Sequence, residues 1–116
     1  RLAEMLLTRS LLRLNSGDAQ GAANDLNTVR ERAWDSDAAG TAYTPLTAGQ
    51  VTADLIHTER MKEMLFEGDR LWYLQAQKIA IPNGDRGAGS VPFNSAGLYY
   101  ELPDDELDLN TAFQGN

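Results

Sequence analysis

The sequence contains no cysteine, so it can form neither disulfides nor thiolate metal sites, and it offers no cysteine nucleophile. Histidine is nearly absent too, since His57 is the only one. A serine-histidine catalytic site would need His57 as its base, yet no nucleophile motif such as Gly-x-Ser-x-Gly occurs in the sequence. These absences leave no credible set of residues for thiol or serine-histidine catalysis.

Positive charge and long apolar runs are also scarce. Seventeen acidic residues against ten lysines and arginines give a formal net charge of -7, whereas binding a nucleic acid backbone requires clustered cations. No stretch approaches the roughly 20 consecutive apolar residues of a membrane-spanning helix, because Arg9 and Arg13 interrupt the most apolar segment. We therefore expect neither a nucleic acid partner nor a membrane span in this chain.

Apolar residues recur at spacings of three and four in residues 1–14 and again in residues 19–33, which predicts two amphipathic helices. Between them, Gly17 can adopt the left-handed conformation that ends a helix, and Asp18 can cap the next one. The first helix has so broad an apolar face that we expect neighbours on more than one side. The sequence thus predicts a tight helical hairpin over residues 1–34.

A second hairpin is predicted over residues 51–78. Its first helix would carry the apolar positions of residues 51–66, with Thr47 as a candidate cap, and Gly68 would end it. We expect Asp69 to cap the second, shorter helix. Because each hairpin contains a Gly-Asp turn, the predicted fold class is mainly α, with tetratricopeptide-like helical hairpins.

Two segments show no sustained periodicity and are predicted to be loops, namely residues 35–50 and the glycine-rich residues 81–97. The tail, residues 98–116, is expected to form a short strand at 98–102 and a helical turn at 103–106. It has too little apolar content to fold alone. The chain also opens at Arg1 inside an apolar helical pattern without a capping residue, so we expect residues 1–116 to be a fragment of something longer.

Glu59, Glu63 and Glu67 lie four residues apart on one face of a predicted helix, and such an array could in principle hold a metal ion. Arg60 and Arg70 supply compensating cations within reach, and the Glu-x-x-His pattern of helical di-metal sites is absent. We expect these five residues to form a structural ion-pair network that ties the last two helices together. No metal and no cofactor is predicted.

The aromatic residues are candidate sugar-binding platforms, because a flat ring packs against an apolar sugar face while its polar edge stays hydrated. Trp72 follows helical spacing, and Tyr99 and Tyr100 fall in the predicted strand, so we expect these three to belong to the core. Trp34 and Tyr43 border the first long loop, where a ligand could reach them. They are the predicted ligand-binding residues.

Three motifs follow one another along the chain. They are Asn-x-x-Arg-x-Arg-Ala at residues 27–33, Glu-Arg-x-x-Glu-x-x-x-Glu-Gly-x-Arg at 59–70 and Leu-Pro-x-x-Glu-Leu-x-x-Asn at 102–110. Together they resemble the C-terminal signature of the SusD/RagB family, over nearly the whole chain, which implies that residues 1–116 are the C-terminal part of a larger SusD-like domain. The sequence departs from that pattern at Asp69, where histidine is frequent, and at Trp34, where glycine is usual.

The resemblance implies a non-catalytic, tetratricopeptide-like scaffold, lipid-anchored at the outer-membrane surface through an N-terminal region absent from this chain. It also implies capture of glycans or peptides for a SusC-like TonB-dependent transporter, with ligand contacts largely elsewhere in the protein. A free-standing tetratricopeptide-type adaptor that binds a peptide in a helical groove is the alternative. The irregular loop at 81–97 argues against that alternative, and the choice between glycan and peptide stays open.

Overall fold

The computed structural model describes residues 2–99, and 62% of the described chain is helical, which confirms the predicted mainly-α fold. The chain divides into two compact units, Arg1–Arg70 and Leu71–Asn116. The first unit holds the predicted ligand-binding pair and most of the polar contacts between helices.

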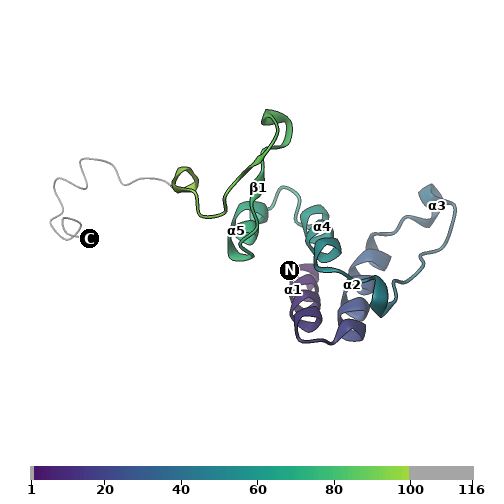
Figure 1. The fold of residues 1–116 in the computed structure, drawn as a ribbon. Coiled ribbons are helices and arrows are strands. Elements are labelled where there is room, and N and C mark those ends of the chain that lie inside the picture. The colour runs from purple at the N-terminus through teal and green to yellow at the C-terminus, as the bar shows by residue number, and fades with distance from the viewer. Residues whose placement is uncertain (1, 100–116) are drawn as a thin grey trace, which may run out of the picture. The chain divides into compact units, whose positions relative to one another are not determined.

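The first unit begins with the predicted helical hairpin, in which α1 (Leu2–Asn15) and α2 (Ala19–Ala33) lie side by side (Figure 1). Gly17 adopts the left-handed conformation with φ of 88°, which reverses the chain without the steric cost that a Cβ would bring. The Asp18 carboxylate accepts a hydrogen bond from the backbone N–H of Gly21 at 2.8 Å. Both predicted turn residues thus act as expected.

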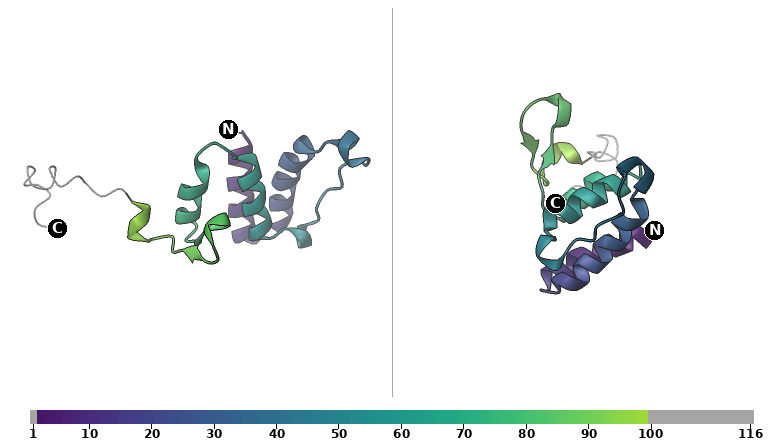
Figure 2. Two further views of the ribbon diagram at one scale, coloured as in Figure 1. Left: turned by 90° about the horizontal axis from the view of Figure 1, so that it is seen from above. Right: turned by 90° about the vertical axis from the view of Figure 1, so that its right-hand side faces the viewer.

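The core of the first unit lies where α1, α2 and α4 (Ala53–Glu63) meet, since α1 packs against both of the other helices (Figures 1 and 2). Alanines on the contact face of α2 allow α1 to approach closely. Fully burying a leucine or isoleucine side chain contributes about 1.5–3 kcal/mol, so this layer is the main source of stability. Its buried apolar residues are Ala3, Leu7, Leu11, Ala22, Ala23, Leu26, Val29, Val51 and Ile56.

The apolar face of α1 is wider than these neighbours cover. Leu2, Met5 and Leu12 are 73%, 65% and 63% exposed. The broad apolar face that the sequence predicts is therefore present on α1, and the described residues leave part of it exposed.

The predicted loop at residues 35–50 contains one helical turn, α3 (Ser36–Ala39), and the 3-10 turn η1 (Ala48–Gln50). After α2 the chain runs out to α3 and then returns (Figure 1). The prediction that Thr47 caps the third helix is wrong, because Thr47 opens η1 instead. The cap of α4 is Thr52, whose hydroxyl accepts from the backbone N–H of Leu55.

Helix α4 ends at Glu63, three residues before the predicted end. Phe66, which the apolar pattern placed in the helix, lies in the following turn with φ of 65° and is 97% exposed. Asp69 was predicted to cap the next helix, but it is the first residue of α5 (Asp69–Ala76), and both its carboxylate oxygens bind Arg60. The turn is therefore longer than the sequence pattern indicated.

In the second unit, part of the predicted loop at 81–97 forms a short antiparallel hairpin. Strand β1 (Ile81–Pro82) pairs with β2 (Ser90–Val91), with Ile81 opposite Val91, and the 3-10 turn η2 (Gly84–Arg86) lies between them. A further 3-10 turn, η3 (Ala96–Leu98), ends the described part. The glycine-rich composition thus predicted the irregularity of this segment and missed its two-residue strands.

Two aromatic residues expected in the core are exposed instead. Trp72 on α5 is 68% exposed, although Leu74 two residues later is buried, because helical spacing alone does not tell which side of a short helix is covered. Tyr99 is 56% exposed and follows η3 with extended backbone. Tyr100, the rest of the predicted strand at 98–102, the predicted turn at 103–106 and the motif at 102–110 lie outside the described residues.

Candidate functional site

Trp34 and Tyr43, the predicted ligand-binding residues, lie against each other at the end of α2. Their ring centroids are 5.8 Å apart and the ring planes are inclined by 58°. The chain can return from α3 to form this pair because Gly40 ends α3 in the left-handed conformation, with φ of 67°. Trp34 is 40% exposed and Tyr43 is half-buried, so the pair has an accessible surface.

The polar edges of both rings are bonded within the protein. The indole Nε1 of Trp34 donates to the carbonyl oxygen of Thr41 at 2.9 Å, and the hydroxyl of Tyr43 donates to Oδ1 of Asn27 at 2.7 Å. A ligand at this pair would therefore contact mainly the apolar part of the rings. Ring faces suit a partner with a flat C–H-rich surface.

Asn27, on α2, binds residues 43–46 of the loop, the returning part that leads back from α3. Besides accepting from Tyr43, its Oδ1 accepts from the backbone N–H of Leu46, and its Nδ2 donates to the carbonyl oxygen of Leu46, both at 2.9 Å. In the sequence Asn27 stood out only as a member of a motif. Its partners lie 16 and 19 residues away, so spacing could not identify them.

Charged residues lie on both sides of Trp34 in the sequence, with Arg32 two positions before it. Asp35 follows Trp34 directly, and its Oδ1 accepts from the backbone N–H groups of Asp37 and Ala38, both at 3.0 Å. No lysine or arginine occurs in the sequence between Arg32 and Arg60. From Trp34 to Glu59 the charged residues of the sequence are therefore all acidic.

The predicted ion-pair residues lie on α4 and in the turn and helix that follow. Arg60 is 6% exposed and binds Asp69 through two hydrogen bonds of 2.8 and 2.7 Å. Its guanidinium also donates to the hydroxyl of Thr8 at 3.0 Å and lies 3.5 Å from the carboxylate of Glu4. Arg60 thereby connects α4 to the start of α5 and also to α1.

Glu59 and Glu63 have partners that the sequence analysis did not anticipate. Glu59 pairs with Arg30 and Glu63 with Arg32, so both contacts run from α4 to α2 rather than to the last helix. Glu67 lies in the turn before α5 and Arg70 in the first turn of α5, and both are exposed. Within residues 2–99, no group of three or more histidine or carboxylate side chains is arranged to hold a metal ion.

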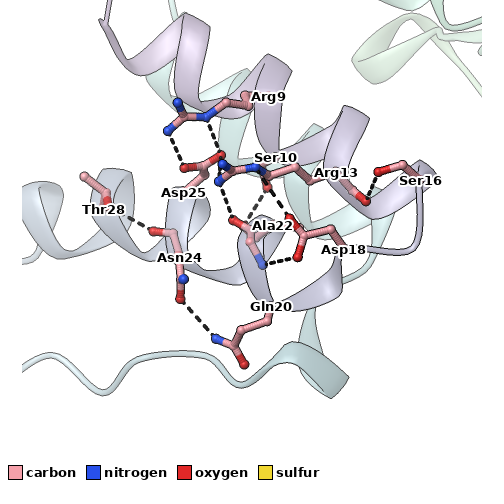
Figure 3. Close-up of polar contacts among 11 residues, drawn as sticks. Arg9, Ser10, Arg13, Ser16, Asp18, Gln20, Ala22, Asn24, Asp25 and Thr28 are labelled. Atoms are coloured by element: carbon pink, nitrogen blue, oxygen red, sulfur yellow. Dashed lines mark hydrogen bonds and ion pairs between the residues drawn. The ribbon is translucent and has the colours of Figure 1, made fainter.

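A second polar cluster, which the sequence analysis missed, joins α1 to α2 (Figure 3). The Asp25 side chain is 5% exposed and accepts from Nε and Nη2 of Arg9 at 2.8 and 2.7 Å and from Nη1 of Arg13 at 2.9 Å. Ser10 adds a buried hydrogen bond to the carbonyl oxygen of Ala22 at 2.8 Å. An aspartate among the apolar positions of α2 with arginines on α1 was the signal that could have indicated this cluster.

The electrostatics of this cluster follow from its geometry. The hydrogen bond from Arg9 lowers the pKa of the Asp25 carboxyl below its ordinary value, against the opposing effect of burial. The charges of Arg9 and Arg13 lower the pKa further. The ionised form of Asp25 is thus favoured, and its carboxylate joins the two helices through hydrogen bonds.

His57 is half-buried on α4, away from the aromatic pair in sequence. Burial lowers the pKa of its imidazole, the charge of Asp54 opposes this effect and the charge of Arg70 adds to it. The neutral form of His57 is therefore favoured near neutral pH.

These features define a protein of helical hairpins, with charged contacts between helices and an aromatic pair on a loop. The chain belongs to the SusD family, whose family model matches residues 1–75. That match covers the first hairpin, the first loop, α4 and most of α5, and it confirms the resemblance seen in the sequence motifs of this region.

The family places the chain in a broad functional class. SusD-family proteins are non-catalytic, nutrient-binding components of the outer-membrane surface that associate with SusC-like TonB-dependent transporters. No curated protein and no solved structure matches the chain. Among residues 2–99, no helix has the length and apolar character needed to cross a membrane.

Proposed function

We propose that this chain is part of the glycan-binding component of a TonB-dependent uptake system at the outer membrane. The protein would be surface-exposed, lipid-anchored through an N-terminal region, and docked on a SusC-like transporter. The family match supports the class of function. The single structural observation that favours a glycan is the Trp34–Tyr43 pair, whose polar edges are bonded internally and which is partly exposed.

Most of this chain, in our proposal, serves as helical scaffold within a larger domain. Arg60, Asp25 and the pairs from α4 to α2 cross between helices, and such contacts hold a fold in place more than they recognise a ligand. The uncovered apolar residues of α1 would then contact the rest of the protein. The aromatic pair adds one sugar contact to a binding site supplied mainly by other segments.

The chemistry of the pair favours a neutral sugar. A pyranose offers an apolar C–H face that stacks on an aromatic ring. Uronates and sulfated sugars would bring negative charge next to Asp35 and Asp37, and between Arg32 and Arg60 the sequence supplies no cation to offset it. The proposed ligand class is therefore neutral polysaccharide.

A binding screen on the complete protein tests this function. We expect affinity electrophoresis and calorimetry to show binding of a neutral polysaccharide, weaker binding of uronate-rich ones, and no binding of peptides. Because stacking involves no charge pairing, raising the salt concentration should change the affinity little. Binding of peptides without any glycan would contradict the proposal and favour a peptide-capturing member of the family.

Replacing Trp34 with alanine tests the contact itself. The loss of one stacked ring is expected to cost about 0.5–1.5 kcal/mol, a roughly two- to tenfold weaker affinity for the neutral polysaccharide identified in the screen. Trp72→Ala is the matched control, because Trp72 is also exposed and lies on α5 in the other unit. Equal affinities of the two variants and the unmodified protein would exclude a sugar contact at Trp34.

A further inference from the structure

We propose that Asn27 is the positioning residue of the Trp34–Tyr43 pair, which it holds in register by latching the returning part of the loop to α2. The proposal rests on the sugar contact proposed above and adds the residue that sets its geometry. Asn27 touches Tyr43 and Leu46 and acts on the ligand only through them.

Asn27 binds this part of the loop through several hydrogen bonds at once. The Asn27 amide makes three hydrogen bonds of 2.7–2.9 Å, two accepted by Oδ1 and one donated by Nδ2. With Leu46 it exchanges both an N–H and a C=O contact, as a neighbouring strand would. A carboxamide is the short side chain that carries a strong acceptor and a donor on one carbon, so neither alanine nor aspartate can reproduce the set.

The segment that leads up to Tyr43 contains no buried residue. Residues 34–42 are all exposed, α3 included, and the bond from Trp34 to Thr41 is exposed as well. Exposed hydrogen bonds compete with water and contribute little net stability. The three bonds of Asn27 are partly buried, and they come just before η1, which packs against α2.

Both rings of the pair are connected to α2. The hydroxyl of Tyr43 is tied to Asn27, and its ring contacts Trp34, which continues directly from the end of α2. The same helix therefore holds both rings, because Tyr43 is hydrogen-bonded to Asn27 of α2 and Trp34 follows the last residue of α2 in the chain. Without the latch, Tyr43 would move with the exposed loop and the inclined pair would lose its fixed shape.

The test compares Asn27→Ala, Asn27→Asp and Tyr43→Phe in the complete protein. Asn24→Ala is the matched control, since Asn24 is exposed on the same helix and its side-chain oxygen accepts a hydrogen bond from Gln20, one turn away. The first readout is hydrogen exchange of residues 41–47, because the backbone N–H of Leu46 is itself bonded to Asn27. The second is affinity for the neutral polysaccharide found in the screen.

We expect Asn27→Ala to speed exchange in residues 41–47 roughly two- to tenfold, with exchange in α1 and α4 unchanged. Affinity should fall about as far as in Trp34→Ala. Asn27→Asp keeps both acceptors and loses the donor, so it should restore part of the protection and part of the affinity. Tyr43→Phe keeps the ring, and combined with Asn27→Ala it should add little further loss.

Unchanged hydrogen exchange of residues 41–47 in Asn27→Ala would show that Asn27 does not hold this part of the loop against α2. If Trp34→Ala weakens binding while Asn27→Ala does not, the positioning role is also overturned and the sugar contact stands. If Asn27→Ala loosens the loop and neither variant changes affinity, the latch is supported and the proposed sugar contact fails. The two proposals are therefore separable by one set of variants.

Discussion

Replacing Arg60 with alanine is expected to lower the free energy of unfolding of the complete protein by about 3–5 kcal/mol, the range for removing one partner of a buried ion pair. Arg60 is 6% exposed and its guanidinium reaches Asp69, Thr8 and Glu4. Alanine would leave the Asp69 carboxylate, which is 16% exposed, without its bidentate partner. Three helices, α1, α4 and α5, would lose their common polar contact.

Urea denaturation followed by circular dichroism measures this loss. Lys62→Ala is the matched control, because Lys62 is a cation on the same helix, 60% exposed and paired only loosely with Glu59. An exposed pair of that kind contributes about 0–1 kcal/mol, so the control should unfold almost as the unmodified protein does. Arg60→Lys should recover only part of the stability, since lysine cannot form the two parallel bonds.

Affinity provides the second half of the test. Since Arg60 holds helices rather than ligand, its alanine variant should bind polysaccharide normally at temperatures where it stays folded. A variant with full stability would contradict the structural role. A stable variant with lost affinity would instead place Arg60 near the ligand.

Replacing Asp25 with alanine is expected to have the next largest effect, about 2–3 kcal/mol of lost unfolding free energy. The carboxylate holds Arg9 and Arg13 against α2, and three hydrogen bonds disappear together. The cost stays below that of Arg60 because the abandoned side chains of Arg9 and Arg13 are 55% and 35% exposed and can recover water. Asp37→Ala, an exposed aspartate, is the control that removes the same charge.

The effect of Asp25 should depend on pH in a defined direction. Because the folded protein lowers the pKa of Asp25 below its ordinary value of 3.8, the unfolded chain takes up the proton first as the pH falls. The stabilisation is complete well above pH 3.8 and is lost as the pH drops towards the folded pKa. The stability difference between the unmodified protein and Asp25→Asn should therefore shrink below about pH 4. A difference that stayed constant into acid would show that Asp25 contributes through packing alone.

Features that depend on neighbours along the chain were predictable from the sequence. The period of three to four apolar residues and the Gly17–Asp18 turn predicted α1 and α2 to within a residue. Spacing and turn chemistry are local, so no tertiary contact was needed to recognise them. The three motifs indicated the family for the same reason, because a motif is defined by the order of residues along the chain.

Local signals failed where the chain had competing choices. Thr47 and Thr52 are both acceptable caps, and the helix that buries Ile56 starts after Thr52. Phe66 fits the apolar spacing of α4, yet the helix ends at Glu63. The side of α5 that is covered was likewise undecided by spacing, which is why Trp72 was misplaced in the core.

The partners of charged and polar side chains were decided by the tertiary structure alone. Asp25 meets Arg9 and Arg13 because the hairpin brings two helices into register, and Glu59 meets Arg30 across 29 residues. Asn27 meets Leu46 because the loop folds back onto α2. Coulomb and hydrogen-bond energies depend on distance in space, and a sequence records only distance along the chain. The sequence by itself therefore determined the helices, the fold class and the family, while the tertiary structure decided which side chains fasten those helices and shape the aromatic pair.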